Sequence, residues 1–200
     1  MPTILLILGA ETRPFAKGDY NRGLFETAIA TLQEHYTVLT TVVEEGYDVP
    51  TEIAKFKQAD TVIFQYPVYW FMMPSVLKRY IDDVYVYGEF FGPGHDYGLN
   101  GLMEGKTFML STTWNAPLAV FDNPDSFFEG QSVAAALFPM RKSQAFCGLT
   151  ELPHFSCHDV VSNPDFAHDQ ARYQQHLAQV FGLNGETGAI AVPVSAASSR

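Results

Sequence analysis

The sequence predicts an α/β fold in which a parallel sheet carries helices on both faces. Five short apolar segments rich in β-branched residues recur along the chain. Stretches with apolar residues at helical spacing lie between them, and this alternation is typical of parallel sheets. The composition agrees, because 200 residues with 47% hydrophobic content suffice for one domain with a sizeable core.

The first half of the chain supplies three predicted strands and two helices. It opens with a continuous apolar run, Pro2 to Leu8, which the following Gly9-Ala10 pair ends. A helix follows to about His35, and Asp19 or Asn21 can cap its N-terminus. The remaining elements are a strand at 36–43, a short helix at 49–57 and a buried strand at 60–65.

The second half continues the alternation with two further strands. Apolar residues at helical spacing predict a helix at 74–87, and a loop rich in glycine and aromatic residues follows at 90–101. Strands are expected at 106–112 and 149–158, and helices at 132–146 and 164–181. The end of the chain is small, polar and low in complexity. We therefore expect one domain at 1–182 and a flexible tail at 183–200.

Charge and cysteine content exclude several classes of partner. The net charge of −10 disfavours nucleic acid and anionic membranes. No apolar run reaches the length of a membrane span, so membrane insertion is not expected. Cys147 and Cys157 are too few for a disulfide framework and are interpreted as reduced thiols. These features together predict a cytoplasmic protein.

An aromatic loop after the third strand is the most informative segment. Tyr69, Trp70 and Phe71 follow Pro67 where the backbone must turn. Three large rings on a loop expose apolar area unless something flat covers them. The carboxyl end of a buried strand in an α/β sheet is also where ligands bind. The segment predicts a site for a planar cofactor; the alternative is a loop packed into the core.

Two further loops are expected at the same edge of the sheet. The loop at 11–22 carries Arg13, Lys17 and Arg22 before a helix N-terminus, a combination that can bind phosphate. Solvated basic side chains are the alternative. The loop at 111–117 offers hydroxyls, an amide and Trp114 to a flavin pyrimidine ring. Its structural alternative is that the threonines cap a turn and Trp114 fills the core.

Several segments resemble the NAD(P)H:quinone reductase family of flavodoxin-like fold. They are Gln65 to Trp70, Val76 to Val84, Thr113 to Pro117, Phe127 to Gly130 and Gly148 to Pro153. The resemblance covers nearly all of the chain except the tail. It implies a three-layer sandwich with a five-stranded parallel sheet of order 2-1-3-4-5. It also implies a homodimer with FAD lying across the dimer interface.

The resemblance also implies which residues hold the cofactor. The isoalloxazine ring would lie against Pro67, Val68, Tyr69 and Trp70. Its polar edge would contact Thr113, Trp114, Asn115 and Ala116, and Tyr97 would be a further contact. The pyrophosphate would be held by Lys17, Gly18, Asp19, Tyr20, Asn21 and Arg22, of which Asn21 matches the family best. Lys17-Gly18 replaces the family's His-Ser pair in a shorter loop, so FMN is a possible cofactor.

The protein is expected to be an FAD-dependent NAD(P)H:quinone oxidoreductase. The flavin would carry the chemistry through N5 in a ping-pong, two-electron cycle, with no catalytic side chain and no metal. Phe71, Phe90 and Phe91 would enclose the quinone, with a second subunit as a possible source of these rings. The alternatives are an FMN-dependent azo- or nitro-reductase, a flavodoxin-type electron carrier and a flavin-free regulatory subunit.

One cluster suggests a metal site that we do not expect. His154, Cys157 and His158 fall within five positions, yet on a strand Cys157 would point away from the two histidines. A closed zinc site also needs a fourth ligand. We expect a strand end here, with Cys157 in the core.

Overall fold

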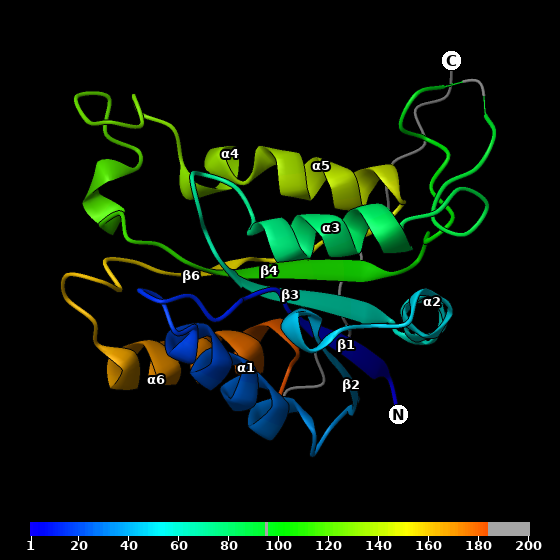
Figure 1. Cartoon of the computed structure of the whole chain (residues 1–200), viewed down its shortest axis with the longest axis horizontal. Coiled ribbons are helices and arrows are strands. Elements are labelled where there is room, and N and C mark those ends of the chain that lie inside the picture. The colour runs from blue at the N-terminus through cyan, green and yellow to red at the C-terminus, as the bar shows by residue number, and fades with distance from the viewer. Residues whose placement is uncertain (95, 184–200) are drawn as a thin grey trace.

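The computed structural model describes residues 1–94 and 96–183 and has one parallel sheet at its centre. The strand order is β2-β1-β3-β4-β5, and β6 also pairs with β4. The predicted order 2-1-3-4-5 is therefore confirmed (Figure 1). The strands are β1 (Thr3–Leu8), β2 (Thr37–Val42), β3 (Thr61–Pro67), β4 (Thr107–Thr113), β5 (Thr150–Glu151) and β6 (Phe155–Cys157).

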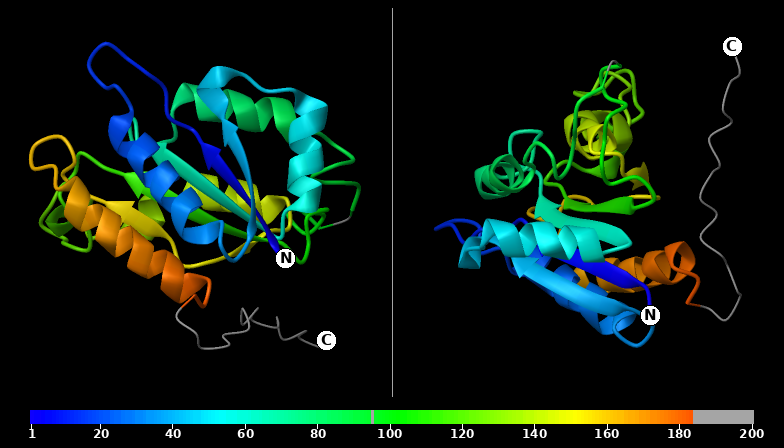
Figure 2. Two further views of the ribbon diagram at one scale, coloured as in Figure 1. Left: turned by 90° about the horizontal axis from the view of Figure 1, so that it is seen from below. Right: turned by 90° about the vertical axis from the view of Figure 1, so that its right-hand side faces the viewer.

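Helices cover both faces of the sheet, which makes the three predicted layers. One face carries α1 (Asp19–Leu32) and α6 (Phe166–Val180), which lie side by side in Figures 1 and 2. The other face carries α2 (Val49–Gln58), α3 (Ser75–Val84), α4 (Val133–Ala136) and α5 (Phe138–Phe146). Two short 3₁₀ helices, η1 (Val43–Glu45) and η2 (Leu118–Val120), complete the set. No helix among the described residues is long and apolar enough to cross a membrane.

The core consists of two apolar clusters, one on each face of the sheet. Side chains of β3 alternate between them: Val62 and Phe64 face α2 and α3, whereas Ile63 faces α1 and α6. All of β1, β3 and β4 is buried. This burial on both faces explains why these strands read as continuous apolar runs.

The last predicted strand is interrupted, because the fifth position of the sheet holds both β5 and β6. Pro153 lies at the break and has no N–H to donate to a ladder. The Leu110 N–H donates instead to Nδ1 of His154 at 3.1 Å. Burial lowers the pKa of His154 to about 4, so the ring is neutral and can accept this bond. His154 thus has a structural role in the sheet.

Two helix predictions also need correction. The single helix expected at 132–146 is divided into α4 and α5 at Leu137, where Pro139 prevents a continuous helix. The helix α1 is capped by Gly18 and not by Asp19 or Asn21. It ends at Leu32, three residues earlier than expected. The expected flexible tail at 183–200 lies outside the described residues except for Leu183.

Candidate functional site

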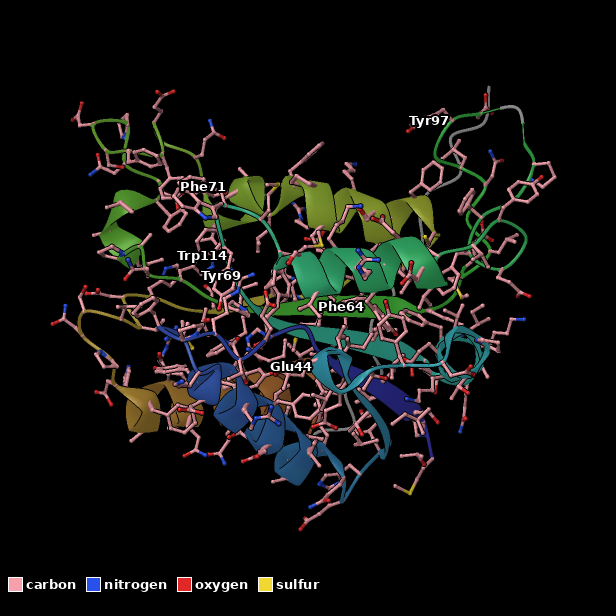
Figure 3. The ribbon with its side chains drawn as sticks, viewed as in Figure 1. Glu44, Phe64, Tyr69, Phe71, Tyr97 and Trp114 are labelled. Carbon is pink, nitrogen blue, oxygen red and sulfur yellow. The ribbon has the colours of Figure 1, made fainter. Side chains whose placement is uncertain are left out.

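The predicted loops meet at one edge of the sheet. The register pairs Leu8 with Gln65, Pro67 with Thr113 and Thr113 with Cys157, so the carboxyl ends of four strands lie together. The Val68 N–H donates to the Thr113 carbonyl at 2.9 Å, and the Trp114 N–H donates to Cys157 at 2.9 Å. Figure 3 shows Tyr69, Phe71 and Trp114 at this end of the molecule. We call it the rim.

The N-terminus of α1 opens onto the rim without a side-chain cap. Gly18 is the N-cap residue, and its φ of 79° lies in the left-handed region that favours glycine. Within residues 1–94 and 96–183, no side-chain hydrogen bond caps this first turn. Uncapped N–H groups at a helix N-terminus, with the positive end of the helix dipole, form a site that can bind phosphate. The side chain of Lys17 is exposed beside it.

Two tight turns stand next to each other at the rim. One is closed by backbone hydrogen bonds between Arg13 and Ala16, the other by bonds between Tyr69 and Met72. The Arg13 guanidinium lies 5.3 Å from the centre of the Tyr69 ring and also pairs with Glu11, so it links the turns and is not a free cation.

The second turn holds its aromatic residues in a strained conformation. Trp70 and Phe71 have φ values of 50° and 64°, which are uncommon for large side chains. Trp70 is nevertheless 87% exposed and Phe71 49% exposed. The Phe71 ring stacks on Phe127 at 5.5 Å. The alternative that this loop packs into the core is therefore wrong, because the rings face outward from a strained turn.

Asn21 links the helix α1 to the central strands. Its side-chain nitrogen donates to Oγ1 of Thr113 at 2.9 Å, and its oxygen accepts from Nε2 of Gln65 at 2.8 Å. All three side chains are buried. These two bonds give the Asn21 side chain a structural role, and its contact with a pyrophosphate stays a prediction. Tyr20 is engaged similarly, because its hydroxyl donates to Asp169 at 2.6 Å.

Replacement of Asn21 by alanine should lower the free energy of unfolding by about 1–3 kcal/mol, because it leaves buried polar groups on Gln65 and Thr113 without partners. Urea unfolding followed by circular dichroism measures the change. The exposed Asn163 provides a matched control, and its replacement by alanine should change stability by less than about 0.5 kcal/mol. Equal stability of the two variants would contradict a structural role for the Asn21 network.

Trp114 belongs to the core and not to an exposed part of the rim. It is 2% exposed, and its indole N–H donates to Oγ1 of Thr112 at 2.9 Å. The ring stacks on His158 and meets Phe121 edge-on. The structural alternative is therefore correct for Trp114, and the predicted contact between its side chain and a flavin is wrong. Asn115 follows it and is exposed.

A cleft of about 860 Å³ begins at the two turns and continues between α3 and α5. Its residues come from the first loop, the aromatic turn and both helices. Much of the wall is formed by residues outside the predicted binding motifs, among them Tyr66, Met73, Leu137 and Met140. Tyr66 lies on β3 and Met140 on α5, whereas Met73 and Leu137 lie just outside helices, and only the packing shows that the four enclose a cavity.

Three predicted contacts lie away from the rim. Tyr97 stands at the opposite end of the molecule in Figure 3, and Phe91 packs with it around Phe146. Phe90 is fully buried against Phe56 and Tyr85. The prediction that Phe90 encloses a substrate is wrong, because its ring has no exposed face. Tyr97 and Phe91 cannot reach the rim of their own chain.

The expected absence of a metal is not contradicted by the geometry. Among residues 1–94 and 96–183, no group of three histidine, cysteine or acidic side chains is placed to hold a metal ion. Cys157 is buried in the core, as expected, and His158 contacts Ser156 and the Ala116 carbonyl.

The fold and the rim together define a flavodoxin-like protein. The Flavodoxin_2 family, described as having a flavodoxin-like fold, matches residues 5–180, and the chain belongs to this family. The chain is 40% identical over 190 residues to the NADPH:quinone oxidoreductase MdaB of Haemophilus influenzae. This match covers 90% of this chain and 99% of that protein.

Solved structures show the same fold. A Klebsiella pneumoniae protein assigned as a quinone reductase superposes with a TM-score of 0.77 at 24% identity, covering 90% of this chain and 85% of that one. General stress protein 14 of Treponema denticola, solved in complex with FMN, gives a TM-score of 0.68 at 23% identity. It covers 92% of this chain and 99% of its own.

Proposed function

We propose that this protein is a flavin-dependent NAD(P)H:quinone oxidoreductase. The observation that carries the proposal is the meeting of an uncapped helix N-terminus and a strained, exposed aromatic turn at one edge of the sheet. A molecule with a phosphate at one end and a flat ring at the other matches this pair of features. The identity to the Haemophilus NADPH:quinone oxidoreductase over nearly its full length supports the same activity.

The residues present fit a flavin. Lys17, Gly18 and Asp19 with the first turn of α1 would hold its phosphate through backbone N–H groups. Val68, Tyr69 and Trp70 would lie against the ring. When bound, the flavin supplies hydride acceptance from NAD(P)H and two-electron transfer to a quinone. FAD is the cofactor that the family resemblance favours, while the FMN complex of the treponemal relative supports FMN as the alternative.

The protein contributes position, electrostatics and the exclusion of water. Among the described residues, the backbone N–H groups of Asn115 and Ala116 make no hydrogen bond, so they can donate to the ring edge where reduction places negative charge. The turn residues Trp70 and Phe71 can cover the ring. One open face would serve NAD(P)H and the quinone in turn, which is the basis of a ping-pong cycle.

A homodimer is part of the proposal. Large apolar side chains are exposed around the rim and the start of α5, and clusters of this kind mark interaction surfaces. They include Phe15, Trp70, Phe71, Met72, Phe127 and Phe138. A second copy of the chain would supply the Tyr97 or Phe91 ring to this rim, because the chain's own Tyr97 lies at the opposite end and Phe91 packs against the same Phe146.

Two alternative functions differ from quinone reduction: azo-dye reduction and electron transfer by a flavodoxin-type carrier. The FMN-dependent NADH-azoreductase of Bacillus anthracis shares the fold at a TM-score of 0.65 and 16% identity, so the fold is common to both activities. An electron carrier of the flavodoxin type would bind flavin without oxidising pyridine nucleotides. The cleft beside the rim favours a substrate-binding enzyme over a carrier.

The purified protein should contain flavin and oxidise NADH or NADPH in the presence of menadione. Acid denaturation and chromatography of the released flavin distinguish FAD from FMN. Steady-state rates at several fixed menadione concentrations should give parallel double-reciprocal lines, as a ping-pong cycle requires. Flavin without turnover would instead identify a carrier, preferential reduction of azo dyes would favour the second enzyme, and no flavin binding would refute all three.

A further inference from the structure

The hydroxyl of Tyr66 is buried without a hydrogen-bond partner. Tyr66 lies near the carboxyl end of β3, is 1% exposed, and belongs to the wall of the cleft between α3 and α5. Within the described part of the chain its oxygen has no partner. Buried polar groups nearly always form hydrogen bonds, so an orphan hydroxyl beside a cavity points to a ligand that completes it.

The chemistry of the cleft restricts that ligand. Its walls near Tyr66 are apolar and include Val68, Met73 and Met140. Its charged groups, Arg13 and Lys78, each pair with a carboxylate, that of Glu11 and that of Asp82 respectively. None of the lining residues is Asp or Glu. An apolar ring carrying an oxygen acceptor matches the apolar walls and the Tyr66 hydroxyl.

Tyr66 can act only as a donor toward such an oxygen. Burial raises the pKa of its phenol, so the proton is retained at neutral pH. The hydroxyl is buried away from water, so side chains in the cleft wall must move slightly before a ligand can reach it. Met73 and Met140 can provide it, because methionine is unbranched and changes rotamer easily.

We propose that this cleft binds the quinone acceptor, with one ring carbonyl accepting a hydrogen bond from the Tyr66 hydroxyl. The inference rests on the proposed function for the identity of the acceptor. Tyr66 is thereby a positioning residue that orients the quinone from beneath the aromatic turn. Acceptors without a carbonyl or comparable oxygen would lose this contact.

The test is an equilibrium titration of the flavin-loaded protein with menadione in the absence of NAD(P)H, measured by isothermal titration calorimetry. Tyr66→Phe should bind menadione about three- to tenfold more weakly than the unaltered protein, which corresponds to one neutral hydrogen bond. Its steady-state KM for menadione should rise.

Tyr173→Phe is the matched control. Tyr173 is also a fully buried tyrosine whose hydroxyl has no hydrogen-bond partner among the described residues, but it packs on the other face of the sheet beside Phe155. Both variants should retain or raise the melting temperature, since each removes an unpaired buried hydroxyl. Only Tyr66→Phe should weaken menadione binding.

The inference would be overturned by unchanged menadione affinity in Tyr66→Phe, by an equal loss in both variants, or by no menadione binding by the unaltered protein. A lower melting temperature of Tyr66→Phe would also contradict it, because it would show that the hydroxyl has a partner inside the protein. If the protein did not oxidise NAD(P)H, the proposed function would be refuted. The proposal for the cleft could still be tested, because the menadione titration needs no reductant.

Discussion

Phe90→Ala is expected to lower the free energy of unfolding by about 3–5 kcal/mol, the range for removal of a buried phenylalanine ring. The ring is fully buried, stacks on Tyr85 at 4.3 Å and meets Phe56 edge-on at 5.0 Å. No neighbouring group can fill the space that it leaves without moving. Urea unfolding of the two proteins under identical conditions measures the loss.

Phe91 provides the comparison for this experiment. It is only partly buried, so Phe91→Ala should cost clearly less than Phe90→Ala. Phe90→Leu preserves most of the apolar volume and should keep both stability and menadione reduction. If Phe90→Leu kept its stability but lost menadione reduction, Phe90 would contact the substrate after all.

Trp70→Ala should weaken flavin binding by about five- to 150-fold, because a planar ring stacked on an aromatic side chain contributes about 1–3 kcal/mol. Trp70 is largely exposed on its strained turn and makes few contacts that would compete with a ligand. The dissociation constant follows from titration of the flavin-free protein with FAD and with FMN, read by flavin fluorescence.

Two further variants separate stacking from other roles of Trp70. Trp70→Phe keeps an aromatic face and should retain most of the affinity, whereas Trp70→Gly relieves the positive φ and should lose affinity as Trp70→Ala does. Tyr87→Ala removes another exposed ring, 64% accessible, that lies away from the rim, and it should not change flavin affinity. Sedimentation measurements must show the same assembly state throughout. Unchanged flavin affinity in Trp70→Ala would refute its contact with the ring.

The strands of the sheet were predictable because each is recognised from local pattern. β1, β3 and β4 are largely apolar along their whole length. This pattern is typical of a strand that is covered on both faces, because successive side chains all point into the core. Predictions failed where a single proline altered a longer element. Pro139 divides the helix expected at 132–146, and Pro153 interrupts the last strand.

Individual site residues were harder to assign than the location of the site. Trp70, Phe90 and Trp114 are all aromatic residues near strand ends or in loops, yet Trp70 is exposed while Phe90 and Trp114 are buried. Asn21 matches the family's cofactor-binding position, but its side-chain amide forms hydrogen bonds with Gln65 and Thr113. Residue type does not distinguish these cases, because exposure depends on contacts between distant segments.

The amino-acid sequence by itself determined the α/β class, the strand order through the family resemblance, and the edge of the sheet where the loops meet. These follow from the periodicity of apolar residues and from the rule that parallel strands end at a common edge. Only the tertiary structure decided which rings face outward, that α3 and α5 enclose a cleft, and that the Tyr66 hydroxyl is left without a partner. Packing between segments far apart in the chain sets these properties, and no local pattern encodes it.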